Sequence, residues 1–511
     1  MLFNSYAFVF LFLPAVLLVF LYLERRQREA ALTWLVVASL FFYAWWKPVY
    51  LLLLLFSMVF NFAVGSRLQR RPAGWLLAVG VAGNLALLGW FKYANFVVDT
   101  VNALSGTQFV LEAIILPLAI SFFTFQQIAW LVDARRGQAA EYNPVHYALF
   151  VCFFPQLIAG PIVHHAEMMP QFARERRERQ RRRDLEIGLT IFFLGFLKKV
   201  VLADTASLHA NPVFDAAARG ELLSFFEAWG GALAYSFQLY FDFSGYSDMA
   251  IGLGRLFGIR LPVNFFSPYR AGSIIEFWRR WHITLARFLR DYLYIPLGGN
   301  RKGRSRTLVN LMLTMLLGGL WHGAAWTFVF WGGLHGAYLV INRLWRDLRR
   351  RLGWDRSFGP GGRALAVGVT FLAAAVGWVV FRAESFPAAA RIYAGMAGLN
   401  GAVLPPEAQS ALGALAGPLQ ALGIDFSPVR YVFGIAEWGW LLLLAVIAFG
   451  FPNIQQLMAR YRPGLMPDHL PLSPSRRQWR PHAGWALGIG LLTAWALLAL
   501  NRVDEFLYFQ F

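Results

Sequence analysis

One ionisable residue stands inside a long apolar, glycine-rich stretch of the sequence. This residue is His322, in the run GGLWHGAAWTFVFW that covers residues 318–331. An ionisable side chain inside a lipid bilayer is costly, so it usually faces the protein interior or a water-filled cavity. A neutral imidazole in such a cavity can take a proton from a hydroxyl nucleophile, since free imidazole titrates near physiological pH. His322 is therefore the first candidate for a catalytic residue.

A second histidine, His282, lies in a segment rich in arginine and aromatic residues. Its neighbours Arg279 and Arg280 favour the neutral imidazole. The pattern fits a place beside the same pocket as His322, and it fits a place in the aromatic belt at the membrane surface equally well. His335 follows His322 by thirteen residues, which puts it on nearly the opposite face of a continuous helix. We expect His335 to serve packing.

The sequence contains no pattern from which we predict a metal site. His164, His165 and Glu167 have the side chains of metal ligands, but the HExxH spacing of zinc enzymes is absent. The single cysteine, Cys152, excludes an internal disulfide framework and a multi-cysteine metal site. We expect no bound metal and no bound cofactor.

A second group of polar residues, SFQLYFDFSGYSDM at 236–249, adjoins a predicted membrane span. Asp242 and Asp248 need positively charged partners there, and we expect these among the arginines of the following region, in a structural ion-pair network. The glycine-rich run GGNRKGR at 298–304 lacks the P-loop pattern but could form a basic rim for an anionic donor. The candidate donor-binding residues are Arg279, Arg280, Trp321, Asn300 and Tyr246.

The composition is that of a membrane protein. Of the 511 residues, 58% are hydrophobic, 17% aromatic and only 15% charged, and the mean hydropathy is +0.48. Apolar runs of membrane-spanning length recur along the chain, whereas the ten-residue alternating segments of outer-membrane barrels are absent. The predicted fold class is an all-α polytopic integral membrane protein with about ten transmembrane helices.

The net charge of +19 would suggest nucleic-acid binding in a soluble protein. Here the basic residues cluster in short loops between apolar runs, which the positive-inside rule and anionic lipid headgroups explain. We therefore expect membrane lipids and no nucleic acid as partners. The arginine-rich run at 174–183 is expected to be a solvated or headgroup-facing helix face.

The basic loops also predict the orientation of the chain. The first apolar run, 1–23, reads as a retained span, and the arginines at 24–29 place the next loop in the cytoplasm and the N-terminus outside. Alternation of spans and basic loops then brings the C-terminus outside as well. Further spans are predicted near residues 32–46, 49–64, 75–91, 114–132, 187–202, 225–243, 364–381, 432–451 and 483–500.

Two segments are expected to enter and leave the membrane on the same side. Residues 145–163 are interrupted by prolines, and residues 307–341 have arginine clusters at both ends. The second segment should turn near Gly318, Gly319 and Gly323, about 20 Å from Thr307 against a hydrocarbon core of about 30 Å. Irregular backbone at that depth must line a cavity, so we predict a channel that reaches His322 from outside.

Taken together, these motifs resemble the membrane-bound O-acyltransferase family, and within it the bacterial alginate O-acetyltransferase branch. The resemblance rests on MLFNSYAFVFLFLP, FPQLIAGPI, SFQLYFDFSGYSDMAIGLGRLFGI, NFFSPYRAGSIIEFWRRWHITLARFLRDYLYIPLGGNRKG, GGLWHGAAWTFVFWGGLHG, VVFRAESFPAA and FLYFQF. It implies one domain over 1–511, with the acyltransferase core at about 114–345, the C-terminal spans at 364–511, and re-entrant and interfacial helices around a central tunnel.

The resemblance further implies an O-acyltransferase of the bacterial inner membrane that takes acetyl from cytoplasmic acetyl-CoA. His322 matches the family's catalytic histidine, and His282 matches a second histidine that some relatives replace by asparagine. The implied partners are a periplasmic SGNH-type O-acetyltransferase and an exopolysaccharide synthesis and export complex. Alginate is the polymer we expect first, with cellulose and peptidoglycan as alternatives.

Two other classes of function remain open at the level of sequence. In a secondary transporter, His322, Asp242 and Asp248 would relay protons, although the chain has no paired halves with matching broken helices. In a non-catalytic scaffold for a polysaccharide synthase, the histidines would be dispensable.

Overall fold

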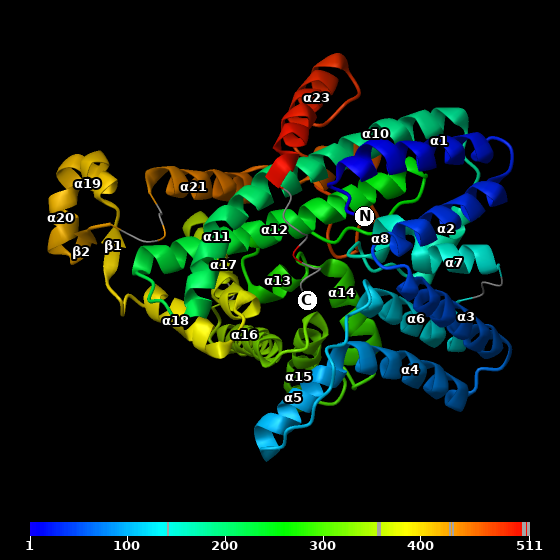
Figure 1. Cartoon of the computed structure of the whole chain (residues 1–511), viewed down its shortest axis with the longest axis horizontal. Coiled ribbons are helices and arrows are strands. Elements are labelled where there is room, and N and C mark those ends of the chain that lie inside the picture. The colour runs from blue at the N-terminus through cyan, green and yellow to red at the C-terminus, as the bar shows by residue number, and fades with distance from the viewer. Residues whose placement is uncertain (140–142, 355–358, 429–430, 432–433, 503–506, 508–511) are drawn as a thin grey trace.

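The computed structural model describes residues 1–139, 143–354, 359–428, 431, 434–502 and 507, and its regular structure is almost entirely helical (Figure 1). The predicted all-α class is thus confirmed in its main feature. The N-terminal part consists of η1 (Ala7–Phe12), α1 (Leu13–Glu24), α2 (Arg28–Ala44), α3 (Val49–Arg70), α4 (Gly74–Leu88), η2 (Gly89–Tyr93), α5 (Ala94–Ser105), α6 (Ile120–Arg135), α7 (Pro144–Cys152), α8 (Phe154–Leu157) and α9 (His165–Phe172).

The middle of the chain carries the longest helices. Its elements are α10 (Glu178–Leu197), η3 (Lys198–Ala203), α11 (Asp204–Arg219), α12 (Phe225–Leu256), η4 (Pro268–Arg270), α13 (Ile274–Trp278), α14 (Ile283–Leu289), η5 (Arg290–Tyr294), α15 (Arg304–His322) and α16 (Trp326–Arg351). The C-terminal part has α17 (Pro360–Arg382), α18 (Phe386–Met396), α19 (Pro406–Leu412), η6 (Gly413–Leu415), α20 (Ala416–Ala421), α21 (Ile435–Gly450), α22 (Ile454–Leu457), η7 (Ala459–Tyr461), α23 (Ala483–Leu498) and η8 (Ala499–Arg502).

Within the described residues, a single small sheet departs from the helical pattern. Strand β1 (Ala402–Leu404) pairs in parallel with β2 (Ile424–Phe426), with Ala402 opposite Ile424. It projects with α19 and α20 at the left of Figure 1. Strands of three residues are too short to give an alternating pattern, which is why the sequence did not predict them.

Four helical segments are long and apolar enough to cross a membrane, among the residues that the structure describes: Ala7–Glu24, Val49–Arg70, Gly74–Ser105 and Pro360–Arg382. The apolar helices α21 and α23 are shorter. The predicted total of about ten crossings stays a prediction. The predicted start of one span was wrong: α6 begins at Ile120 rather than near 114.

The central element is α12, a helix of 32 residues whose side chains are nearly all buried. It extends to Leu256, well beyond the predicted end at 243. Figure 1 shows it in the middle of the molecule with α10 and α11 alongside. The approach to α10 is close because glycines face each other: a Cβ on Gly195 would lie 2.7 Å from the carbonyl oxygen of Gly245.

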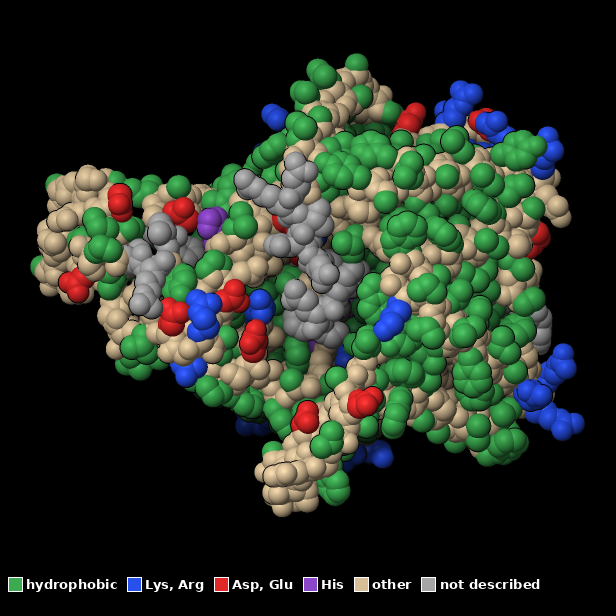
Figure 2. Space-filling model, viewed as in Figure 1, with side chains coloured by type: hydrophobic (Ala, Val, Ile, Leu, Met, Phe, Trp, Pro, Cys, Tyr) green, Lys and Arg blue, Asp and Glu red, His purple; other side chains and the backbone are tan. Residues whose placement is uncertain are grey.

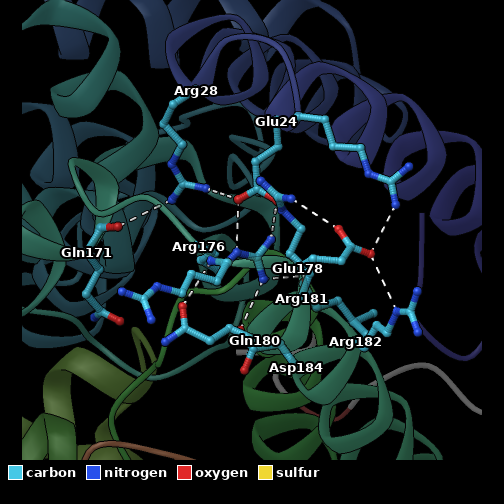
Figure 3. A network of polar contacts seen from close by, with 12 residues as sticks. Glu24, Arg28, Gln171, Arg176, Glu178, Gln180, Arg181, Arg182 and Asp184 are labelled. Atoms are coloured by element: carbon cyan, nitrogen blue, oxygen red, sulfur yellow. Dashed lines mark hydrogen bonds and ion pairs between the residues drawn. The ribbon is translucent and has the colours of Figure 1, made fainter.

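A network of charged residues ties α1 to α10 and α12 (Figure 3). The buried carboxylate of Glu24 accepts hydrogen bonds from Arg176 at 2.9 and 2.7 Å and from Arg181 at 3.1 Å. Asp184 then binds Arg176 and Arg255 at 3.2 and 3.0 Å. The expectation of a solvated face at 174–183 is therefore wrong for Arg176, which is buried because Glu24 balances its charge.

The outer surface is consistent with a membrane environment. Figure 2 shows hydrophobic side chains over much of the visible face, and Lys and Arg side chains gathered at its right-hand edge. At this edge Figure 1 has the loops after α1 and α3 and the beginning of α10. Lipid would face the apolar surface, and the basic edge is typical of the cytoplasmic side.

Candidate active site

His322 is the last residue of α15, and residues 323–325 join this helix to α16. The two helices pack closely because a Cβ on Gly319 would lie 2.2 Å from the carbonyl oxygen of Phe328. A Cβ on Gly332 would lie 2.3 Å from the carbonyl oxygen of Met315. Only glycine permits this approach, so these two glycines determine how α15 and α16 fit together.

The turn of this hairpin lies later than predicted. Gly318 and Gly319 are helical, and among the three glycines proposed for the turn only Gly323 belongs to it. The sixteen residues from Thr307 to His322 extend about 24 Å, whereas the predicted turn lay about 20 Å from Thr307. The error arose because glycine in a membrane helix marks a close helix contact as often as it marks a bend.

The imidazole of His322 is buried in a group of aromatic rings, with 5% of the residue exposed. Its ring centroid lies 5.1 Å from those of Trp321 and Trp331 and 5.4 Å from that of Phe381. The ring of His282 follows at 6.2 Å. The structure thus brings together the two histidines that the sequence singled out.

His282 is held in place by its backbone and by Asn264. Its φ of 44° lies in the left-handed region, which side chains rarely adopt, and it precedes the first turn of α14. Its Nδ1 lies 3.2 Å from Oδ1 of Asn264, which also accepts hydrogen bonds from the hydroxyl and amide of Thr284 at 2.9 and 3.2 Å. Because that oxygen accepts, Nδ1 carries the proton, and Nε2 is the basic nitrogen of the ring.

A cavity of about 650 Å³ lies next to the chain neighbours of His282. Ile283 and Thr284, which follow His282 in the chain, line it, as do Trp278, Thr314 and Met315. Three arginines line its edge, Arg279, Arg287 and Arg290, together with the carboxylates of Glu167 and Asp468. Arg287 is paired with Glu167, and Arg290 with Asp291. The volume and the mixture of apolar wall and charged edge suit an extended organic ligand that carries an anionic group.

A second, much smaller cavity of about 40 Å³ touches the catalytic candidate directly. His322, Trp321 and Lys92 line it together with Ile158 and residues 116–122. His322 borders only this small cavity, while the residues after His282 border the large one. Of the two histidines, His322 thus lines the small cavity, and His282 is joined to the large one only through its chain neighbours Ile283 and Thr284.

The other predicted donor-binding residues are more scattered. Trp321 lies at the site, as described, and Arg279 lines the large cavity. Arg280 does not line it, because its guanidinium pairs with Glu276 at 2.7 Å. Asn300 is exposed in the turn before α15, and Tyr246 is buried and stacks on Phe3 at 4.8 Å.

The aspartates of α12 form an ion-pair network, but with different partners from those expected. Lys199 binds Asp242 at 2.7 Å and Asp204 at 2.6 Å, and Lys198 binds Asp248 at 2.7 Å. These lysines precede α12 in sequence, whereas the expected arginines follow it. The close packing of α10 on α12 brings η3 alongside the aspartates, which local sequence could not reveal.

His335 and Glu167 are held by hydrogen bonds and ion pairs to other side chains. His335 is buried and accepts a hydrogen bond from Nε1 of Trp278 at 3.2 Å, in keeping with its predicted packing role. Glu167 binds Arg287 through both oxygens at 2.5 and 2.9 Å. Among the described residues, no group of His, Cys, Asp and Glu has the arrangement of a metal site.

The Glu167–Arg287 pair sets the charge state beside the large cavity. Burial alone would raise the pKa of the Glu167 carboxyl, but the Arg287 guanidinium more than offsets this and holds the pKa below its ordinary value. Burial, and after it the charge of Arg287, lowers the pKa of His164 to about 4. Glu167 is therefore ionised and His164 neutral at physiological pH.

Two residues near the histidines were not predicted from the sequence. Asn264 gave no signal, since one asparagine in an irregular segment is unremarkable. Lys92 did give a signal, because it is a cation inside the apolar helical segment 74–105. A charged residue within a membrane segment is a candidate functional residue.

Known proteins resemble this chain over most of its length. A sequence model described as MBOAT, the membrane-bound O-acyltransferase family, matches residues 7–374. The peptidoglycan O-acetyltransferase of Helicobacter pylori is 46% identical over 436 residues, which cover 79% of this chain and 81% of that protein. The probable alginate O-acetylase AlgI of Pseudomonas aeruginosa is 45% identical over 409 residues, covering 78% and 75%.

A more distant relative transfers a different acyl group according to its name. The teichoic acid D-alanyltransferase of Streptococcus thermophilus is 30% identical over 295 residues, which cover 54% of this chain and 70% of that protein. The match to the family model contains both His282 and His322.

Proposed function

The chain belongs to the membrane-bound O-acyltransferase family and is an acyltransferase, and we propose that it takes acetyl from cytoplasmic acetyl-CoA for the O-acetylation of a polysaccharide outside the inner membrane. A periplasmic acetyltransferase of the SGNH type would receive the acetyl group and pass it to the polymer. Both termini would lie in the periplasm.

The observation that carries this proposal is that the rings of His322 and His282 lie 6.2 Å apart, with His322 at a small cavity and the residues after His282 at a large one. The large cavity has three arginines and two carboxylates at its edge, and Arg279 among them suits a phosphate of a coenzyme A thioester. The arginines at this edge favour the cytoplasmic side, where that donor is found. The small cavity at His322 has room for a small acyl group or hydroxyl but not for a large donor.

The chemistry follows from the two imidazoles. His322 takes the proton from an acceptor hydroxyl as the hydroxyl oxygen attacks the carbonyl carbon of the thioester. The tetrahedral intermediate then breaks its carbon–sulfur bond, and the proton passes from His322 to the departing coenzyme A thiolate. His282, fixed by Asn264, orients the donor together with Arg279. An ester and free coenzyme A are the products, and no redox partner is needed.

The polymer is proposed from the relatives. The two relatives at 46% and 45% identity are named for peptidoglycan and alginate, and both names describe transfer to a polysaccharide hydroxyl. We propose alginate as the first acceptor polymer to test, within an exopolysaccharide synthesis and export complex. Peptidoglycan is the second, since a relative with that name covers the chain equally well.

The test uses the purified full-length protein in lipid nanodiscs with radiolabelled acetyl-CoA and a periplasmic SGNH-type acetyltransferase. We expect label to reach that partner with wild-type protein, and His322→Ala to lower the rate by about 10²- to 10⁴-fold, as for loss of a general base. His482→Ser is the matched control, because serine can still cap the N-terminus of α23 as His482 does.

The rival functions give different outcomes in two further assays. In sealed vesicles a transporter would move substrate inward without any acyl donor, and in cells a scaffold would leave His322→Ala fully functional. Transfer by His322→Ala at the wild-type rate would contradict the catalytic role proposed here.

A further inference from the structure

Lys92 lies deep in the helical segment 74–105, in the π-helical turn η2 between α4 and α5. It follows Gly74 by eighteen residues, or about 27 Å along the helix, which is most of the hydrocarbon core of about 30 Å. The segment starts just after the basic loop 67–71, so Lys92 lies toward the opposite side of the membrane from that loop. It borders the small cavity together with His322.

The ammonium group of Lys92 binds the end of α15. Its Nζ donates to the carbonyl oxygen of Trp321 at 2.6 Å and to that of His322 at 3.3 Å. The last carbonyl groups of a helix have no partner within the helix and carry its partial negative charge. A cation at this point therefore satisfies two acceptors that an apolar neighbour would leave unpaired. Tyr93 supports the same end by donating to the carbonyl of Leu320 at 2.9 Å.

The hydrogen bonds of Lys92 also limit what the residue can do. An ammonium group has three N–H donors, and the third lies 3.3 Å from Oγ of Ser121. All three donors thus have protein acceptors, so none is left to stabilise an oxyanion of the substrate. Any effect of Lys92 on transfer has to pass through the residues that it holds.

We infer that Lys92 is a positioning residue for His322: its ammonium group fixes the carbonyls of Trp321 and His322 and so holds the imidazole at the small cavity. This rests on the catalytic role proposed for His322. Loss of the ammonium group leaves the large cavity unchanged, because Lys92 does not line it. Transfer should therefore slow while donor binding persists.

The test compares kcat and KM for acetyl-CoA in Lys92→Met, Lys92→Gln, His322→Ala and the control Lys47→Met, all as full-length protein. Lys47 lies between α2 and α3, and its ammonium group lies 5.5 Å from the centroid of the Tyr50 ring. We expect Lys92→Met to lower kcat by about 10-fold or more with KM within about 2-fold, the split that marks a transition-state effect. Lys92→Gln keeps two N–H donors and should fall between Lys92→Met and wild type.

Hydrogen–deuterium exchange provides a readout that does not depend on activity. In Lys92→Met we expect faster exchange of the amides in residues 318–326, and unchanged exchange there in Lys47→Met. Wild-type kcat in folded Lys92→Met, or in Lys92→Gln if the methionine variant does not fold, would overturn the inference while His322→Ala stays inactive. Activity of His322→Ala would instead overturn the proposed function.

Discussion

The imidazole rings of His282 and His322 lie 6.2 Å apart at an angle of 60°, although one precedes α14 and the other ends α15. The two histidines are positioned by different contacts, one to the ring of His282 and one to the backbone of His322. Asn264 binds His282 from the irregular segment after α12, and Lys92 binds the backbone at His322 from η2. The site is therefore assembled from elements spread over residues 92–322 of the chain.

Because the backbone of His282 is left-handed, substitutions at this position should differ in their effect on stability. Asparagine adopts a φ near 44° more readily than a β-branched residue does. We expect His282→Asn to fold with reduced kcat, and His282→Val to be less stable than His282→Asn by about 1–3 kcal/mol. Thermal unfolding in detergent, followed by tryptophan fluorescence, measures the difference. Equal melting of the two variants would show that this backbone is not strained.

Arg279 and Arg280 are adjacent in sequence but should differ in function. Arg279 lines the large cavity, whereas Arg280 pairs with Glu276. We expect Arg279→Ala to raise KM for acetyl-CoA by about 3- to 10-fold, the loss of roughly 1 kcal/mol from a solvated phosphate contact. Arg280→Ala is the matched control and should leave KM unchanged. The effect of Arg279→Ala should shrink at high salt, because salt screens the contact.

The glycines between α15 and α16 should tolerate no side chain at the points of closest approach. In Gly319→Ala the new Cβ would meet the carbonyl oxygen of Phe328 at 2.2 Å, and the helices would have to separate. We expect a loss of stability of about 1–3 kcal/mol and reduced transfer, since His322 would move with α15. Gly333→Ala, whose Cβ would lie 3.3 Å from a leucine methyl group, is the control. Gly319→Ala melting together with Gly333→Ala would refute this account.

The Glu167–Arg287 pair should make stability depend on pH at the acidic end. In the folded protein the pKa of the Glu167 carboxyl is lower than the ordinary value of 4.5. The pair therefore contributes stability above pH 4.5, and this stability is lost as the pH falls through the folded-state pKa of Glu167. We expect Glu167→Gln to lose about 1–3 kcal/mol at pH 7. The difference from wild type should narrow as the pH is lowered below 4.5. Thermal unfolding at several pH values from 7 down to about 3 measures this, and a difference that stays constant over the whole range would contradict it.

Much of the site could be predicted because its signals are local. His322 and His282 are ionisable residues in apolar or aromatic surroundings, and Arg279 belongs to an arginine-rich segment that the positive-inside rule places at the cytoplasmic face. The membrane helices could also be predicted, since an apolar run of sufficient length folds as a helix in lipid whichever segments pack against it.

What could not be predicted depends on contacts between distant segments. Asp242 binds Lys199 rather than an arginine because α10 packs on α12, and Arg176 is buried because Glu24 approaches it from the first helix. Arg280 differs from Arg279 only in the direction that its side chain takes in three dimensions. The turn after α15 was misplaced because a glycine at a helix contact and a glycine at a bend look alike in sequence.

The buried cluster of Lys199, Asp204 and Asp242 has a consequence for how the protein is made. Lys199 and Asp204 leave the ribosome before Asp242, so for a time this charged pair lacks its partner from α12. An incomplete group of charges is costly in lipid. The segment from α10 to α12 should therefore remain in the insertion machinery as one unit and be released into the bilayer only when its charges have met.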